Sequence, residues 1–141
     1  MWRDLARLCA KYDLPWKQPT DFPRSSLTAA RLALLGTDQT WGPSFVRAVY
    51  RANFERDQDI GDESLLASLL SALGLPAASL LEQARAPAVK DRLKAQTAEA
   101  GRMGIFGAPN LIVEGELFFG QDRLEDALAW AAGSHPRPRM P

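Results

Sequence analysis

The sequence predicts an α/β chain that is mostly helical and carries one β-hairpin. Two short apolar runs, residues 111–113 and 117–119, flank Glu114-Gly115-Glu116, and β-rich runs around a glycine-containing break are typical of a hairpin. Most of the remaining sequence places apolar residues at helical spacing between Gly and Pro breaks. At 141 residues, with 46% hydrophobic and 24% charged, the chain is long enough for one domain with a buried core.

Six helices are expected before the hairpin and one after it. Their ends are set by proline and glycine, and Asp122 is placed to cap the last of them. Cys9 lies on the apolar stripe of the first helix, where we expect a small core residue rather than a reactive thiol. The first predicted helix begins at the first residue and ends before Pro15, and the other predicted ranges are 27–35, 40–56, 63–73, 77–85, 87–103 and 122–132.

Aromatic residues recur along the third predicted helix, at Trp41, Phe45, Tyr50 and Phe54. Such a stripe is able to line a ligand pocket or to fill the core. Aromatic residues at helical spacing are more often core, and that interpretation is favoured here.

Composition excludes several classes of function. Seventeen basic residues balance seventeen acidic ones, so no overall charge favours nucleic acid or an anionic membrane. No apolar stretch is long enough to span a bilayer, and the N-terminus lacks the apolar region of a signal peptide. We therefore expect a cytoplasmic protein without nucleic-acid or membrane partners.

Cys9 and His135 are the single residues of their types. A single cysteine excludes an internal disulfide and a Cys-x-x-Cys motif, and a zinc site is not expected from one Cys and one His. Ser-His-Asp or Cys-His catalysis would have to recruit His135. That histidine lies in a Pro-rich tail, residues 134–141, which we expect to be disordered.

The residues around the hairpin carry a family resemblance. Phe106-Gly107-Ala108-Pro109-Asn110, followed after the hairpin by Phe118-Phe119-Gly120-Gln121-Asp122-Arg123-Leu124, resembles the C-terminal half of a thioredoxin-like domain. The resemblance is to the DsbA-like branch that contains 2-hydroxychromene-2-carboxylate isomerases and kappa-class glutathione transferases. It extends upstream through residues 22–31 and covers roughly residues 2–132.

The resemblance implies the C-terminal part of a thioredoxin-like domain with a large helical insertion. The expected organisation is a single domain, 1–141, with a mainly helical insertion at 1–103 and the hairpin with the last helix at 104–133. The family begins with a strand, a loop that bears the catalytic Ser or Cys, a helix and a second strand. None of these is expected here, so no catalytic residue is assigned. Arg24 and Ser25 also stand where relatives often carry Asn.

The same resemblance implies a glutathione site on the residues that match the family motifs. Pro109 corresponds to a proline that is typically cis, and the backbone of Ala108 would pair with the cysteinyl part of glutathione like an added strand. Gln121 and Asp122 would receive the γ-glutamyl end, where unpaired N–H groups attract a carboxylate. Arg123 would add charge there or pair elsewhere.

The function implied is glutathione-dependent isomerisation of an intermediate in aromatic-compound degradation, by a homodimer. Glutathione transfer and dithiol oxidoreduction are related alternatives. A fragment or a misassigned start codon stays open. So does a non-catalytic remnant, because a lone hairpin presents an apolar face and an open edge that favour dimerisation or binding of a partner.

Overall fold

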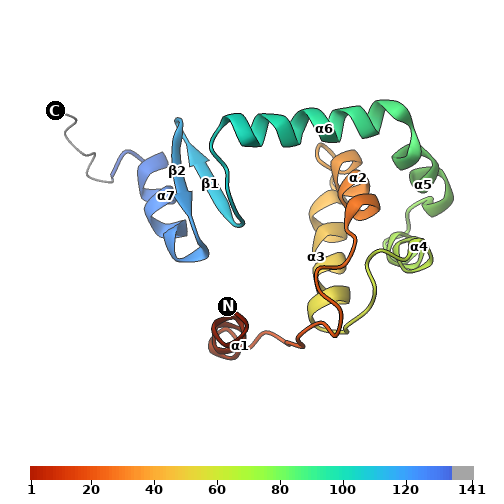
Figure 1. Cartoon of the computed structure of the whole chain (residues 1–141), viewed down its shortest axis with the longest axis horizontal. Coiled ribbons are helices and arrows are strands. Elements are labelled where there is room, and N and C mark those ends of the chain that lie inside the picture. Colours follow the sequence, from red (N-terminus) through yellow and green to blue (C-terminus); the bar gives the residue numbers. More distant parts are fainter. Residues whose placement is uncertain (135–141) are drawn as a thin grey trace. The chain divides into compact units, whose positions relative to one another are not determined.

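The computed structural model describes residues 1–134, and within them it is mostly helical with one β-hairpin, as the sequence predicts (Figure 1). Proline and glycine separate the helices, and two prolines bound α5 on both sides. The elements are α1 (Trp2–Lys11), α2 (Leu27–Leu35), α3 (Gly42–Phe54), α4 (Glu63–Ala72), α5 (Ala77–Arg85), α6 (Pro87–Arg102), β1 (Asn110–Val113), β2 (Glu116–Phe119), the 3₁₀ turn η1 (Gln121–Arg123) and α7 (Leu124–Ala131).

The chain folds into two compact units, of which the first spans residues 1–93 and the second begins at Lys94. The organisation expected from the sequence, one domain with parts at 1–103 and 104–133, stays a prediction. His135 and the rest of the predicted disordered tail after Ser134 lie outside the described residues. Within those residues, no helix is both long enough and apolar enough to cross a bilayer.

The core of the first unit is built by α2, α3, α4 and α5 (Figure 1). α2 packs against α3 and α5, and α4 packs against the same two helices. The apolar positions of each helix fall on the face that meets its neighbours, as an amphipathic helix requires. The largest fully buried side chains of this core are Leu32, Phe45, Leu66 and Leu70.

A buried ion pair joins the segment before α2 to the turn after α3. The Arg24 guanidinium contacts the Asp57 carboxylate, and both side chains are almost fully buried. Arg24 Nη1 also donates to Asn53 Oδ1 and to the carbonyl oxygen of Gln58, at 2.9 Å each. A buried guanidinium is stable only when its donors are paired. Arg24 therefore fixes the path of the chain from α3 into the turn that follows.

Aromatic side chains connect α1 and the irregular segment after it to the end of α3. The Trp2 and Phe22 rings meet edge to face with their centroids 4.8 Å apart, and the Trp16 ring stacks on Phe54 at 5.9 Å. Offset and edge-to-face arrangements of this kind stabilise aromatic pairs beyond their burial. The aromatic residues of the connector thus pack without forming regular secondary structure.

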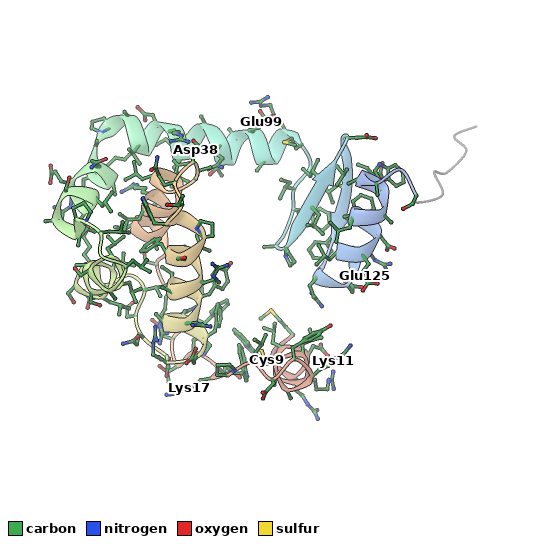
Figure 2. The ribbon with its side chains drawn as sticks, turned by 180° about the vertical axis from the view of Figure 1, so that it is seen from behind. Cys9, Lys11, Lys17, Asp38, Glu99 and Glu125 are labelled. Carbon is green, nitrogen blue, oxygen red and sulfur yellow. The ribbon has the colours of Figure 1, made fainter. Side chains whose placement is uncertain are left out.

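The prediction that Cys9 belongs to the core is wrong. α1 contains no buried residue, and Cys9 is only half-buried on it (Figure 2). The apolar stripe that places Cys9 on a helix is present in the sequence. Within the first unit, residues 1–93, no element covers that stripe closely enough to bury it.

The second unit contains the β1–β2 hairpin and α7. Asn110 pairs with Phe119 and Val113 with Glu116, which leaves Glu114 and Gly115 as a two-residue loop. Both loop residues have positive φ, +52° and +84°, as a type I′ turn requires. α7 packs on the hairpin (Figure 1), where Trp130 is buried with its ring 5.7 Å from that of Phe118.

Asp122 does not cap the last helix, which corrects the prediction. α7 begins two residues later, at Leu124, with Arg123 at its N-cap position and no side-chain cap. Gly120 has φ +110° and ψ 152°, a conformation that is open essentially to glycine alone. It is followed by η1, in which the Arg123 N–H donates to the Gly120 carbonyl at 3.2 Å.

The ion pair of Arg24 predicts how stability depends on pH. The backbone N–H of Thr20, the Arg24 guanidinium and the Lys17 ammonium hold the pKa of Asp57 well below its usual range. A depressed folded-state pKa stabilises the fold fully above the unfolded pKa of about 3.9, and this stabilisation is lost as the pH falls further. We expect Asp57→Asn to lower the melting temperature at pH 7, by an amount that shrinks progressively below about pH 4.

Melting curves recorded from pH 7 to pH 2.5 test this expectation. Asp21→Asn is the matched control, because Asp21 is exposed and forms no ion pair with a described residue. A melting difference for Asp57→Asn that is equally large at pH 7 and pH 2.5 would contradict the account.

Candidate functional site

Two segments that the sequence assigns to one site lie side by side at the open end of the hairpin. The register pairs Asn110 with Phe119, and one step further the Gly120 N–H donates to the carbonyl oxygen of Pro109 at 3.0 Å. This bond joins the segment before β1 to the segment after β2. The structure therefore brings Ala108 and Pro109 next to the turn that begins at Gln121.

The segment before β1 offers an unpaired stretch of backbone. The Ala108–Pro109 peptide bond is cis, as the family motif implies. Ala108 is exposed, and neither its N–H nor its carbonyl oxygen bonds to another described residue. An extended peptide segment is able to use such a pair of groups in the manner of an added strand.

Aromatic side chains form an apolar wall beside this segment. The Phe106 and Phe119 rings lie with their centroids 4.7 Å apart and are 71% and 48% exposed. A Cβ at Gly107 would lie 2.8 Å from the Phe119 ring. The ring and the backbone therefore approach as closely as a glycine permits.

The turn after β2 holds Gln121, Asp122 and Arg123, all three of them exposed. The first N–H groups of a helical turn have no partner within the turn, and the backbone N–H groups of Gln121 and Asp122 donate to none of the described residues. The Asp122 carboxylate folds back over Gly120, where a Cβ would collide with it. One corner thus offers N–H donors for a carboxylate and a carboxylate for an ammonium group.

Arg123 is held within the corner by two acidic side chains. Its Nη1 lies 3.1 Å from an Asp126 carboxylate oxygen, and its Nε lies 3.8 Å from an oxygen of Asp122. Of the two alternatives that the sequence left open, the structure shows Arg123 paired with acidic neighbours, and a contribution of its charge to a ligand stays a prediction. In this structure Arg123 balances Asp122 while it is anchored to the first turn of α7.

A second candidate site lies in the first unit, in a pocket between α2 and α3. The pocket has a volume of about 460 Å³, within the range of small-molecule sites. Phe45, Tyr50 and Phe54 of the aromatic stripe line it, although Phe45 is also fully buried in the core. Trp41 instead packs edge to face on Phe45, at 6.1 Å. The stripe thus divides between core and pocket wall.

The polar residues of this pocket include Arg24 and Asn53, neither of which is predicted as a site residue from the sequence. Arg24 comes before α2, whereas Asn53 is buried on α3. The available signal was a lone Asn among the apolar positions of an amphipathic helix. Its partner could not be read from spacing, since the two residues are 29 positions apart.

Comparison with known proteins gives consistent matches over most of the chain. Residues 1–129 match the model of the DSBA-like thioredoxin domain. The chain is 34% identical over 125 residues to a 2-hydroxychromene-2-carboxylate isomerase of Sphingobium xenophagum, a match that covers 89% of this chain and 63% of that protein. It is also similar to the solved structure of a selenomethionine-labelled 2-hydroxychromene-2-carboxylate isomerase, with a TM-score of 0.80 and 25% identity over 92% of this chain and 63% of that one. The chain spans less than two thirds of the length of either relative.

The conformation of Gly120 predicts that a side chain at this position lowers the stability of the protein. We expect Gly120→Ala to destabilise the protein by about 1–3 kcal/mol, because a Cβ is strained at this φ and ψ and would displace the Asp122 carboxylate. Urea unfolding measures the difference.

Gly101→Ala is the control for that variant. Gly101 lies in α6 with no atom near the position of an added Cβ, so alanine there should stabilise the helix by about 0.5–1 kcal/mol. Equal stability changes of the two variants would show that the corner does not have the described geometry.

Proposed function

The chain belongs to the DSBA-like thioredoxin domain family, and we propose that it supplies the glutathione-binding part of an isomerase acting on an aromatic small molecule. Its similarity to 2-hydroxychromene-2-carboxylate isomerases over 89% of its length supports the isomerase class. The observation that carries the proposal is the bond from the Gly120 N–H to the Pro109 carbonyl. It sets the unpaired backbone of Ala108 beside the donors and the carboxylate of residues 121–123.

In this proposal, each polar group of glutathione meets a complementary group of the corner formed by Ala108 and residues 121–123. Its γ-glutamyl end carries both a carboxylate and an ammonium group. The N–H groups of Gln121 and Asp122 bind that carboxylate, and the Asp122 carboxylate accepts from the ammonium. The backbone of Ala108 pairs with the cysteinyl residue, and Arg123 keeps the local charge balanced through Asp126.

The nucleophile of the proposed isomerisation is the thiol of glutathione. A glutathione bound at this corner would supply a thiol nucleophile for reversible addition to the substrate. The residues of this chain would bind and orient the peptide. Phe106 and Phe119 present apolar surface beside it.

No residue of this chain is assigned to stabilise the thiolate. The chain spans 63% of the length of the relatives that it resembles, and the activity of the whole protein, its aromatic substrate and its partners belong to the proposal. Transfer of glutathione uses the same binding corner and is the nearest alternative reaction. Dithiol oxidoreduction is the second alternative; it uses two cysteines, of which the 141 residues of this sequence contain one.

The proposal includes a homodimer in the cytoplasm. The described sheet has two strands, so one edge of each strand carries unpaired backbone groups that favour pairing with another chain. A single cysteine suits a reducing compartment.

Calorimetric titration with reduced glutathione tests the binding site. We expect binding in the millimolar range, lost in Asp122→Ala because the ammonium group of the γ-glutamyl residue then lacks its carboxylate partner. A glutathione analogue without that ammonium group should bind the wild-type protein as weakly as glutathione binds Asp122→Ala.

Glu125→Ala is the matched control for this experiment. Glu125 is an exposed carboxylate in the first turn of α7 (Figure 2), and its loss should leave the affinity unchanged. Absence of heat from the wild-type protein at millimolar ligand would refute the site, as would equal losses in the two variants.

A further inference from the structure

The apolar face of α1 lacks full cover within the first unit. The helix is ten residues long, has no side-chain cap at its N-terminus and contains no buried residue. Helices of fewer than about 12–15 residues are marginal in water on their own, and packing of an apolar face supplies most of their stability in proteins. A further surface that covers this face would therefore stabilise α1.

That apolar face is a stripe that runs the length of the helix. At one end the Trp2 ring meets Phe22 edge to face with the centroids 4.8 Å apart, which anchors the stripe to the first unit. At the other end Tyr12 is 61% exposed, and the side chains in between are only half-buried. These side chains recur at helical spacing, and together they form the α1 stripe: Trp2, Leu5, Leu8, Cys9 and Tyr12.

Opposite charges lie along one edge of the α1 stripe. Asp4 and Lys11 are separated by about two helical turns, so both project on the same side of the helix. The Asp4 side chain is 61% exposed although it contacts Arg7, and the exposed Lys11 forms no ion pair with a described residue. Arg3 and Arg7 fall on the side of the helix opposite to the stripe. The edge thus carries an acid near one end and a base near the other.

A second copy of α1 complements this edge when the two helices run in opposite directions. A two-fold axis between the helices brings the same edge of both copies together. With the axis midway between residues 7 and 8, Asp4 of each copy lies level with Lys11 of the other, and the two Leu8 side chains meet near the axis. In a parallel pair, opposite edges meet, and both charges face the edge that carries Ala6. Only the antiparallel pair therefore matches charges of opposite sign.

From these observations we propose that α1 is a self-association surface, on which two copies of the chain pair their α1 stripes antiparallel and form two ion pairs between Asp4 and Lys11. The inference rests on the homodimer proposed above and names an interface for it. It does not depend on the glutathione corner, because α1 belongs to the first unit and the corner to the second. A helix of ten residues is about 15 Å long, so the interface is small and the dimer is weak.

An anionic membrane surface is the competing occupant of the α1 stripe. Arg3 and Arg7 would attract such a surface, since basic residues on the polar side are typical of interfacial helices. Asp4 beside the stripe would oppose it, whereas the antiparallel pair uses the charges of Asp4 and Lys11 together. The charge pattern therefore favours a second copy.

Sedimentation equilibrium of the whole 141-residue chain measures the self-association. We expect a dimer with a Kd on the order of 100 μM, as befits a small interface. Leu8→Lys should weaken it about tenfold or more, because an ammonium group would be buried at the centre of the interface without a partner. Arg3→Glu is the matched control on the opposite side of the helix, and it should leave the Kd unchanged.

Exchange of charges makes the test specific for the antiparallel pair. Asp4→Lys sets two ammonium groups level with each other, and Lys11→Glu sets two carboxylates level with each other. Each variant alone should self-associate about tenfold more weakly, because two exposed pairs in the dimer change from attraction to repulsion. An equimolar mixture of the two variants should restore the association at low salt, since each mixed dimer contains two pairs of opposite charge, and added salt should diminish this recovery.

Several results would overturn the proposal, and each is distinguishable from a failure of the glutathione site. A dimer that Leu8→Lys leaves intact would show that the homodimer uses another surface, such as the open strand edges. A monomeric wild-type protein, or a mixture of Asp4→Lys and Lys11→Glu that stays monomeric, would also contradict it. So would binding to phosphatidylserine vesicles without self-association. Glutathione calorimetry on Leu8→Lys should give the wild-type affinity, and circular dichroism checks that each variant is folded.

Discussion

A single backbone hydrogen bond, from the Gly120 N–H to the Pro109 carbonyl oxygen, holds together the part of the molecule on which the proposed function depends. The residues that it joins, Pro109 and Gly120, lie at the two ends of the hairpin, next to Ala108 and Gln121. The two-residue turn at Glu114 and Gly115 sets the register, and this bond extends that register by one step. If the register slipped by one residue, every side chain of a strand would change face and the corner would no longer form.

The conformation of Gly120 is the second constraint on the corner. Its φ of +110° directs the chain from β2 into a 3₁₀ turn instead of directly into α7. Asp122 lies within this turn, does not cap α7, and places its carboxylate against Gly120. The conformation of Gly120 thus leaves Asp122, which the sequence predicted as a helix cap, with an exposed carboxylate.

The first unit depends in the same way on one buried side chain. Arg24 binds Asp57, Asn53 and the carbonyl of Gln58, and so links the segment before α2 to α3 and the turn behind it. The same guanidinium sets the orientation of the Asn53 amide in the pocket.

The sequence predicted the fold class well because its signals are local. Pro76 and Pro87 bound α5 at Ala77–Arg85, as predicted, and the type I′ turn falls at the expected glycine. Family motifs also indicated which residues meet at the corner, and the structure brings those residues together. Their binding of glutathione stays a prediction.

Other features could not be predicted from local signals. Asp122 looked like an N-cap because it precedes an amphipathic helix, and nothing in the spacing reveals the conformation of Gly120. Cys9 lies on a stripe typical of a core helix, yet burial depends on what the rest of the fold brings to that face. The contacts of Asn53 and Asp57 with Arg24 span 29 and 33 residues, so they follow from tertiary packing alone.

The most direct test of the central claim is a nitrogen-15 NMR titration of the whole chain with glutathione. The account predicts that the backbone amide signals of Ala108, Gln121 and Asp122 shift together and give one Kd, because both segments contact the same molecule. Shifts confined to one segment, or different Kd values for Ala108 and Gln121, would contradict the claim that the corner is a single glutathione site.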